Sequence, residues 1–235
     1  MQPIQQTHTN VKLAAVVMGL VMVVACSSSQ PVEVDRPANV SSFDPELRAA
    51  RIETSGCEFA SGRTGSGVAV ENGLVITVAH LVARAADLEV SIDDVVAKDA
   101  VVAAVDLERD LAVIRVPTVK VPDVVTSAVT KGEHGQIVGS ATSGTVSFEV
   151  KAVVDLTIEE ILGTDRHSRM GYELAASTAD GDSGAGVYDD ADQLIGIVFA
   201  TSQDGTSTWV TAVSEIESFL SKVDQSATYA ACEAG

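Results

Sequence analysis

The sequence predicts an all-β fold, a barrel or a sandwich, and three observations support this prediction. Apolar residues make up 46% of the 235-residue chain, which is enough for one domain with a substantial core. Short apolar runs recur along the chain, and clusters of Gly, Asp and Ser separate them. Valine supplies much of the apolar content, and β-branched residues are typical of strands. Four such runs are 67–70, 74–78, 101–105 and 194–199.

The first segment, 1–25, is predicted to be a signal peptide. Lys12 precedes an almost wholly apolar stretch, 13–25, which is too short to span a membrane as a helix. The stretch leads into Val-Val-Ala-Cys, ending at Cys26, and this ending resembles a bacterial lipobox. The resemblance implies cleavage before Cys26, a lipid on that cysteine and a membrane anchor. The alternative is an ordinary signal peptide with a coincidental cysteine, in which case the protein is secreted.

Two further segments complete the expected organisation. Residues 26–50 contain Ser, Pro and charged residues without a periodic pattern, which favours a flexible tether. Residues 51–235 are the expected folded domain. Near its end, Ser214 and Glu217 match a capping box, so we expect one short C-terminal helix. Apolar residues follow at helical spacing, namely Ile216, Phe219, Leu220 and Val223.

Charge and cysteine content narrow the environment of the domain. The formal net charge is −18, so an acidic surface repels phosphate backbones and we expect no nucleic-acid partner. If Cys26 carries a lipid, Cys57 and Cys232 remain, one near each end of the domain. Outside the cytoplasm such a pair tends to be oxidised, so we predict a disulfide between them. The alternative is two unrelated buried thiols.

The segment 178–186 reads T-A-D-G-D-S-G-A-G and places Ser183 between glycines. Glycines permit a tight bend that exposes backbone N–H groups, so this serine is either a nucleophile or part of a surface turn. Upstream, His80 ends an apolar run and Asp110 directly precedes another. Histidine can move a proton near neutral pH, and a carboxylate can hold its ring. Asp106 is the competing acid, and we favour Asp110 because of its place before the run.

The remaining histidines and cysteines indicate no metal site. His8, His134 and His167 lie in polar or Gly-containing stretches, where we expect them to be exposed. The sequence contains neither HExxH nor paired CxxC, and we expect no metal and no cofactor.

Three blocks now carry a resemblance over about residues 51–223. T-V-A-H, R-D-L-A-V-I-R-V and G-D-S-G-A-G, in this order, resemble the catalytic blocks of trypsin-like (chymotrypsin-fold) serine proteases of the bacterial non-zymogen type. The resemblance implies two packed six-stranded β-barrels with a short C-terminal helix and an active site between the barrels. It implies Ser183 as nucleophile, His80 as general base and Asp110 as orienting acid. It also implies an oxyanion hole formed by the N–H groups of Gly181 and Ser183.

The resemblance leaves two points to settle. In zymogen-activated relatives a new N-terminus pairs with the acid before the serine, here Asp182, but this chain has no obvious activation peptide. Asp182 therefore needs another partner. The specificity pocket is expected at Ser177, Ala200 and Thr201. A serine at position 177, where trypsin-type enzymes carry an acid, removes the reason to expect cleavage after Lys or Arg, so we expect apolar or small residues instead.

The sequence as a whole predicts an exported serine endopeptidase of the cell envelope, anchored to a membrane through a lipid on Cys26. It acts on protein or peptide substrates through an acyl-enzyme, and we expect a monomer. Two rival interpretations are a catalytically inactive binding lipoprotein with a protease fold and a purely structural envelope lipoprotein. The intact set of His80, Asp110 and Ser183 favours the enzyme.

Overall fold

The computed structural model describes residues 44–57, 62–71, 73–97, 99–140, 144–230 and 232, all within one compact unit, Asn39–Gly235. The predicted signal peptide, Cys26 and most of the predicted tether lie outside the described residues. In the part that is described, no helix is long and apolar enough to cross a membrane.

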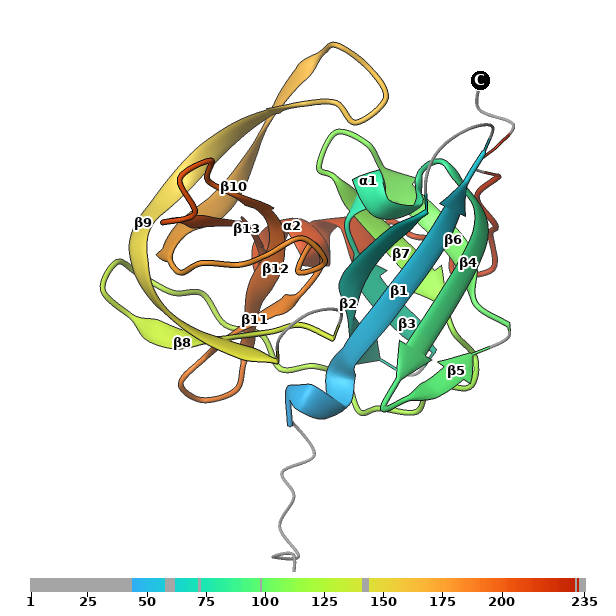
Figure 1. The fold of residues 1–235 in the computed structure, drawn as a ribbon, viewed down its shortest axis with the longest axis horizontal. Coiled ribbons are helices and arrows are strands. Elements are labelled where there is room, and N and C mark those ends of the chain that lie inside the picture. Colours follow the sequence, from blue (N-terminus) through green and yellow to red (C-terminus); the bar gives the residue numbers. More distant parts are fainter. Residues whose placement is uncertain are drawn as a thin grey trace, which may run out of the picture. The chain divides into compact units, whose positions relative to one another are not determined.

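The N-terminal half forms a curled, antiparallel seven-stranded sheet in the order β5-β4-β1-β2-β3-β7-β6, drawn from blue to green in Figure 1. Its strands are β1 (Ala49–Gly56), β2 (Arg63–Glu71), β3 (Leu74–Thr77), β4 (Ala85–Ile92), β5 (Val95–Ala97), β6 (Val101–Asp106) and β7 (Leu111–Arg115). A 3-10 turn, η1 (Glu46–Arg48), precedes β1, and a one-turn helix, α1 (Ala79–Val82), follows β3.

The C-terminal half forms a closed six-stranded barrel in the order β10-β13-β12-β11-β8-β9, drawn from yellow-green to red-brown in Figure 1. Its strands are β8 (His134–Val138), β9 (Thr145–Glu159), β10 (Arg166–Ala175), β11 (Gly186–Asp189), β12 (Leu194–Thr201) and β13 (Thr208–Ala212). The long β9–β10 hairpin extends beyond the rest of the barrel (Figure 1).

The predicted all-β fold class is confirmed, with one correction to the strand count. The second barrel has the expected six strands, whereas the first sheet has seven. The additional strand is β5, which pairs with β4 across a turn at Asp93 and Asp94. Both aspartates have positive φ, 50° and 59°, which suits a two-residue hairpin whose turn matches the strand twist. Aspartate is one of the few non-glycine residues that adopts this conformation readily, so the short valine pair can form a strand.

Two apolar cores hold the halves together. The first fills the curled sheet with fully buried β-branched residues such as Ile52, Val75 and Ile114. The second fills the barrel around Leu174 and Val210. Because successive side chains of a strand point to opposite faces, these cores fix the register of each strand and hence the loops at its ends.

The C-terminal helix is present, but the predicted capping box is wrong. Helix α2 (Val213–Leu220) begins before Ser214, and its N-cap residue, Ala212, makes no side-chain cap hydrogen bond. Glu217 is used elsewhere, because its carboxylate accepts a hydrogen bond from Thr126 Oγ1 at 2.7 Å. Ile216 and Phe219 are buried, as the helical spacing predicted.

The domain begins before the expected boundary at residue 51. Ala50 is fully buried, and the buried Arg48 donates a hydrogen bond from Nη1 to the carbonyl of Ala69 at 3.0 Å. At the other end, the segment after α2 returns to the first sheet, where Tyr229 N–H donates to Val102 O at 2.8 Å. The segment 44–50 is too short to show the alternating apolar pattern that predicts a strand. Its last two residues are recognised as part of β1 only from their pairing with β2.

The predicted disulfide is confirmed. Cys57, directly after β1, is bonded to Cys232, with a Cα–Cα distance of 5.5 Å and a sequence separation of 175 residues. The bond therefore closes nearly the whole domain into one covalent loop and fixes the returning C-terminal segment to the first sheet.

Candidate active site

His80 and Asp110 are joined by two hydrogen bonds. His80 lies in α1, which follows β3, and Asp110 directly precedes β7, which pairs with β3. The ring Nδ1 of His80 is 2.8 Å from Asp110 Oδ2, and the backbone N–H of His80 donates to Oδ1, also at 2.8 Å. An ionised carboxylate only accepts, so Nδ1 carries the hydrogen and Nε2 is left with a free lone pair. Such a ring can take up a proton at Nε2.

Asp110 is buried and has an unusual backbone conformation. Asp110 is 2% exposed, and its φ of 52° lies in the left-handed region, which aspartate tolerates better than most residues. The competing acid, Asp106, bonds to Arg109 instead, with 2.7 Å between Oδ2 and Nη1 and 2.9 Å between Oδ1 and the backbone nitrogen. Asp110 is therefore the acid that contacts His80, whereas Asp106 is hydrogen-bonded to Arg109 in the loop before it.

Both sheets hold the turn that carries Ser183. Gly181 and Gly184 have φ of 100° and 87°, which glycine adopts without strain. The backbone N–H of Ser66 in β2 donates to Ser183 O at 2.8 Å, and Gly184 N–H donates to Val198 O in β12 at 2.7 Å. A Cβ at Gly184 would lie 1.9 Å from Ser66 O, so no other residue fits there. The turn is fixed between the N-terminal sheet and the barrel.

The two predicted oxyanion donors are uncommitted. Across the described residues, the N–H groups of Gly181 and Ser183 donate no hydrogen bond. Within the described part of the chain, Ser183 and His80 also form no hydrogen bond with each other. Catalytic hydrogen bonds are commonly long in an unliganded site and shorten when substrate binds. The segments nevertheless lie together, because a Cβ at Gly65 would meet both Leu81, next to His80, at 2.5 Å and Ser183 O at 3.1 Å.

Asp182 finds partners within its own turn. Its side chain is 3% exposed, and Oδ2 accepts a hydrogen bond from the backbone N–H of Ala179 at 2.9 Å. On its other side, a Cβ at Gly139 would lie 2.9 Å from Asp182 Oδ1. The Ala179 N–H therefore contributes to holding this buried carboxylate, for which zymogen-activated relatives use a new N-terminus.

A cavity of about 520 Å³ opens beside Ser183. Ala200 and Thr201, both predicted for the specificity pocket, line it, whereas Ser177 is exposed and does not. The neighbouring Thr178 lines it instead, and its Oγ1 lies 2.6 Å from Thr201 Oγ1 and 3.0 Å from Thr208 Oγ1. The wall of the cavity thus includes a set of mutually bonded hydroxyls and the exposed Asp180, without a carboxylate at position 177.

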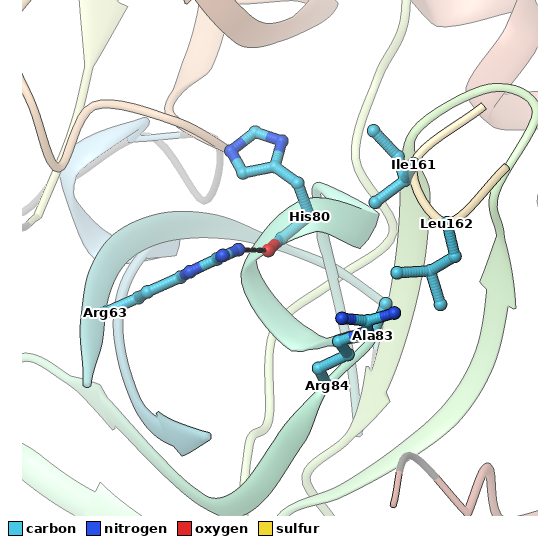
Figure 2. Close-up of a pocket in the computed structure, with 6 residues that line it drawn as sticks. All are labelled: Arg63, His80, Ala83, Arg84, Ile161 and Leu162. Atoms are coloured by element: carbon cyan, nitrogen blue, oxygen red, sulfur yellow. Dashed lines mark hydrogen bonds between the residues drawn. The ribbon is translucent and has the colours of Figure 1, made fainter. Parts of the chain in front are cut away.

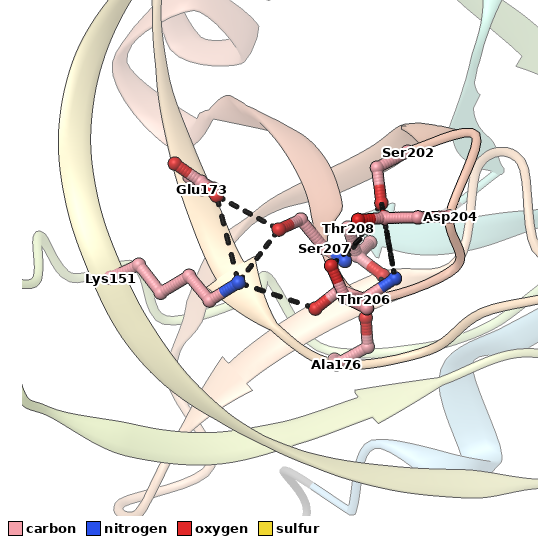
Figure 3. A network of polar contacts seen from close by, with 8 residues as sticks. All are labelled: Lys151, Glu173, Ala176, Ser202, Asp204, Thr206, Ser207 and Thr208. Carbon is pink, nitrogen blue, oxygen red and sulfur yellow. Dashed lines mark hydrogen bonds and ion pairs between the residues drawn. The ribbon is translucent and has the colours of Figure 1, made fainter.

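A polar network braces the β12–β13 turn beside this cavity (Figure 3). Lys151 Nζ donates to Ser207 Oγ at 2.8 Å, and the same hydroxyl donates to Glu173 at 2.8 Å. At the tip of the turn, hydrogen bonds from Ser202 and Thr206 lower the pKa of Asp204 to about 2. These contacts fix the strand ends from which Thr201 and Thr208 project.

The described residues contain no group of three side chains suited to hold a metal ion. His134 is exposed, and His167 is partly exposed and lies 3.5 Å from Glu108. His8 lies outside the described residues.

Sequence reasoning missed Arg169, which is buried near the site. Arg169 is 2% exposed and lies 4.1 Å over the ring of Phe199, the residue between Val198 and Ala200 in β12. Burial lowers the pKa of its guanidinium to about 10. In the described part of the chain, its Nε, Nη1 and Nη2 atoms have no hydrogen-bond partner. The signal that would have found it is the alternation of β10, in which Arg169 shares the inward face with Gly171.

Comparison with known proteins places this geometry in a family. The family model of the trypsin-like peptidase domain matches residues 65–197, which include the three predicted catalytic blocks. The serine proteases MT3772 and Rv3671c, from two strains of Mycobacterium tuberculosis, are each 26% identical over 208 residues, covering 86% of this chain and 51% of the relative. The chain therefore spans about half the length of the curated relatives it matches.

Solved structures agree with the family model in fold. The active form of the Rv3671c protease from M. tuberculosis superposes with a TM-score of 0.72 at 22% identity, covering 94% of this chain and 99% of that one. An HtrA-type protease, AlgW with a tripeptide, superposes with a TM-score of 0.65 at 20% identity, covering 80% and 64%. With the family model matching more than half of its length, the chain belongs to the trypsin-like peptidase domain family.

Proposed function

We propose that this domain is a serine endopeptidase that hydrolyses peptide bonds through an acyl-enzyme. Ser183 is the nucleophile, His80 the general base and Asp110 the acid that orients the imidazole. The observation that carries the proposal is the pair of hydrogen bonds from His80 to the Asp110 carboxylate, at 2.8 Å each, in a trypsin-like peptidase domain.

The proposed reaction has two steps. Ser183 Oγ attacks the scissile carbonyl carbon while His80 Nε2 takes the hydroxyl proton, and the imidazolium then gives that proton to the leaving amine. Water, deprotonated by the same nitrogen, next attacks the ester and releases the acid product. The uncommitted N–H groups of Gly181 and Ser183 bind the oxyanion that forms in each step, each contributing about 3–4 kcal/mol by analogy with measured oxyanion donors.

Labelling with a fluorophosphonate probe tests the nucleophile. The full chain with its disulfide intact is expected to react at Ser183, and Ser183→Ala is expected to abolish labelling. The matched control is Ser177→Ala, a nearby exposed serine outside the cavity lining, which is expected to label like the wild type. A wild-type chain that neither labels nor cleaves a peptide library would favour the rival proposal of an inactive binding module.

We further propose that the enzyme prefers a small or apolar residue before the cleaved bond. Ala200 and the bonded hydroxyls of Thr178 and Thr201 line the cavity beside Ser183. Asp180 also lines it but is exposed, so among the described residues the cavity has no buried counter-charge for a basic side chain. Profiling with a peptide library checks this, and dominant cleavage after Lys or Arg would refute it.

For localisation we propose an exported, monomeric protein anchored through a lipid on Cys26. The lipobox-like ending before Cys26 and the disulfide between Cys57 and Cys232 support export, since disulfides persist outside the reducing cytoplasm. Metabolic labelling with a clickable fatty acid in a bacterial host is expected to mark the wild type and not Cys26→Ala. Labelling of both, or of neither, would overturn the anchor, and light scattering of the chain without residues 1–26 measures its oligomeric state.

A further inference from the structure

A second cavity, of about 410 Å³, lies on the His80 side of the site. Figure 2 shows Arg63 reaching the main chain of His80 from one side, while Arg84 and the hairpin residues Ile161 and Leu162 lie on the other. Arg63 comes from the start of β2, and Arg84 follows α1. The guanidinium of Arg63 donates to the carbonyl oxygen of His80.

The wall opposite α1 is a fixed structure. Ile161 and Leu162 lie at the tip of the β9–β10 hairpin, and Ile161 N–H donates to Leu107 O, in the loop before Asp110, at 3.3 Å. This contact joins the hairpin of the barrel to the β6–β7 loop, at one of the residues that line the cavity. The two apolar side chains reduce the access of water to the cavity, which strengthens electrostatic interactions within it.

Neither of the two arginines is neutralised by a paired carboxylate, and Arg115 shares this property among the described residues. Asp and Glu outnumber Lys and Arg by 33 to 15, yet among the described residues neither Arg63 nor Arg84 forms an ion pair. Three other arginines do have carboxylate partners, namely Arg51, Arg109 and Arg166. The cavity therefore concentrates positive charge on an otherwise acidic protein. Arg84 is exposed, so its guanidinium is accessible to a ligand in the cavity.

The cavity lies close to the expected position of the cleaved bond. His80 lines this cavity and Ser183 lines the one of about 520 Å³. An extended peptide advances only about 3.3 Å per residue. If its scissile carbonyl lies at Ser183 with a side chain in the larger cavity, a side chain within two residues of the cleaved bond reaches the neighbourhood of His80.

From this geometry we propose that the cavity is a substrate subsite for an acidic side chain, Asp or Glu, within two residues of the cleaved bond. Arg84 binds the carboxylate, and Arg63 adds positive potential from the opposite side. The planar guanidinium of arginine suits a carboxylate because it can donate two parallel hydrogen bonds. The inference rests on the proposed endopeptidase function and names one feature of its substrates.

Matched peptides provide the test. Each pair differs only by Asp against Asn at one position within two residues of the cleaved bond, and the readout is the ratio of the two kcat/KM values. The wild type is expected to prefer Asp at one position by about tenfold, because a hydrogen bond to a charged carboxylate is stronger than one to a neutral amide and solvent exposure limits the gain. The preference is expected to weaken as salt rises from 0.05 to 0.5 M, because the subsite is partly open to solvent.

Substitutions then assign the preference to Arg84. Arg84→Gln is expected to bring the ratio close to one, and Arg84→Glu to favour Lys over Asp at the same position. Arg63→Gln is expected to lower the ratio less. The matched control is Arg166→Gln, an exposed arginine at the start of β10 that pairs with Glu159, and its ratio is expected to equal that of the wild type.

The outcomes separate this inference from the proposed function. A wild-type enzyme that labels with a fluorophosphonate and cleaves peptides, but whose ratio is one at every position, overturns the acidic subsite and leaves the endopeptidase intact. An equal loss of preference in Arg166→Gln and Arg84→Gln would also overturn it, because the effect would be one of net charge. Absence of Ser183-dependent labelling removes the proposed function itself, and the substrate subsite with it.

Discussion

The hydroxyl of Ser66 in β2 donates a hydrogen bond to the carbonyl oxygen of Gly181, with 2.9 Å between the oxygens. The Ser66 hydroxyl oxygen in turn accepts a hydrogen bond from Ser140 N–H at 3.2 Å. A residue of the first sheet therefore fixes the peptide group that joins Gly181 to Asp182, between the two predicted oxyanion donors. The N-terminal half, which contains His80 and Asp110, therefore also supports the turn that carries Ser183.

The first prediction concerns this hydroxyl. Ser66→Ala is expected to lower kcat by about fivefold with little change in KM, because one hydrogen bond contributes about 1 kcal/mol and the lost one positions groups that act on the transition state. Ser55→Ala is the control, since its hydroxyl donates to Asp87 in an exposed contact between β1 and β4 of the same sheet. Steady-state kinetics on one peptide decides the matter. A rise in KM at constant kcat, or an equal effect of Ser55→Ala, would contradict a role in the oxyanion hole.

The second prediction separates charge from backbone conformation at Asp110. Asparagine tolerates the φ of 52° as aspartate does, so Asp110→Asn is expected to fold with nearly wild-type stability. Its amide would present N–H to His80 Nδ1 and favour the unproductive tautomer, so kcat is expected to fall about 10⁴-fold, as in the corresponding change in trypsin. Asp110→Ala adds backbone strain of about 1 kcal/mol and is expected to melt at a lower temperature. Activity of Asp110→Asn near that of the wild type would exclude the proposed role.

The third prediction concerns the disulfide. The bond closes a loop with a sequence separation of 175 residues, for which the chain-entropy model gives a stabilisation of about 5 kcal/mol. Replacing Cys57 and Cys232 together by serine is expected to lower the urea midpoint strongly while m stays similar. Cys26→Ser serves as the control because it leaves this bond in place. An unchanged midpoint in the double variant would show that contacts of the returning segment, such as Tyr229 with Val102, hold it without the covalent bond.

The fourth prediction is a pH dependence at Asp204. Because hydrogen bonds from Ser202 and Thr206 lower the pKa of this carboxyl to about 2, the ionised form is favoured in the folded state. Its contribution to folding is present above the unfolded pKa, near 3.9, and is lost as pH falls through about 2. Carboxyl NMR titration is expected to give Asp204 one of the lowest midpoints in the protein. A midpoint near 4 would show that the turn does not hold this charge in solution.

The sequence predicted the strands and the three catalytic blocks because each has a local signal. The apolar runs mark the strands, and Ser183 is recognisable from its glycines, which only a tight turn explains. The pairing of His80 with Asp110 came from a resemblance, since 30 residues separate them and no periodic pattern connects them. The structure supplies the physical reason, which is the pairing of β3 with β7.

Contacts between distant segments were not predictable from the sequence. In the sequence, Arg63 and Arg84 have no feature that distinguishes them from ordinary surface charges. Only the structure shows that they line a cavity together with residues of the β9–β10 hairpin. The capping box at Ser214 failed because Glu217 found a partner on another loop, and a tertiary contact of this kind overrides a local preference. Thr178 is buried and lines the cavity, whereas the adjacent Ser177 is exposed and does not. Which of the two lines the cavity depends on the backbone course of the stretch after β10, which has no local sequence signal.

The last prediction concerns the buried cation. Arg169 is 2% exposed, its guanidinium nitrogens have no hydrogen-bond partner within the described residues, and burial lowers its pKa to about 10. Burying such a charge costs free energy, which the contact with the Phe199 ring and the attraction of the carboxylates of Asp110, Glu215 and Asp106 offset only in part. Arg169→Met keeps the apolar stem without the charge, so the free energy of unfolding is expected to be unchanged or higher by up to about 4 kcal/mol. Urea denaturation measures it, with Arg166→Met, at an exposed position of the same strand, as the control. A loss of several kcal/mol in Arg169→Met would show that the guanidinium has hydrogen-bond partners in solution, with buried water as the candidate.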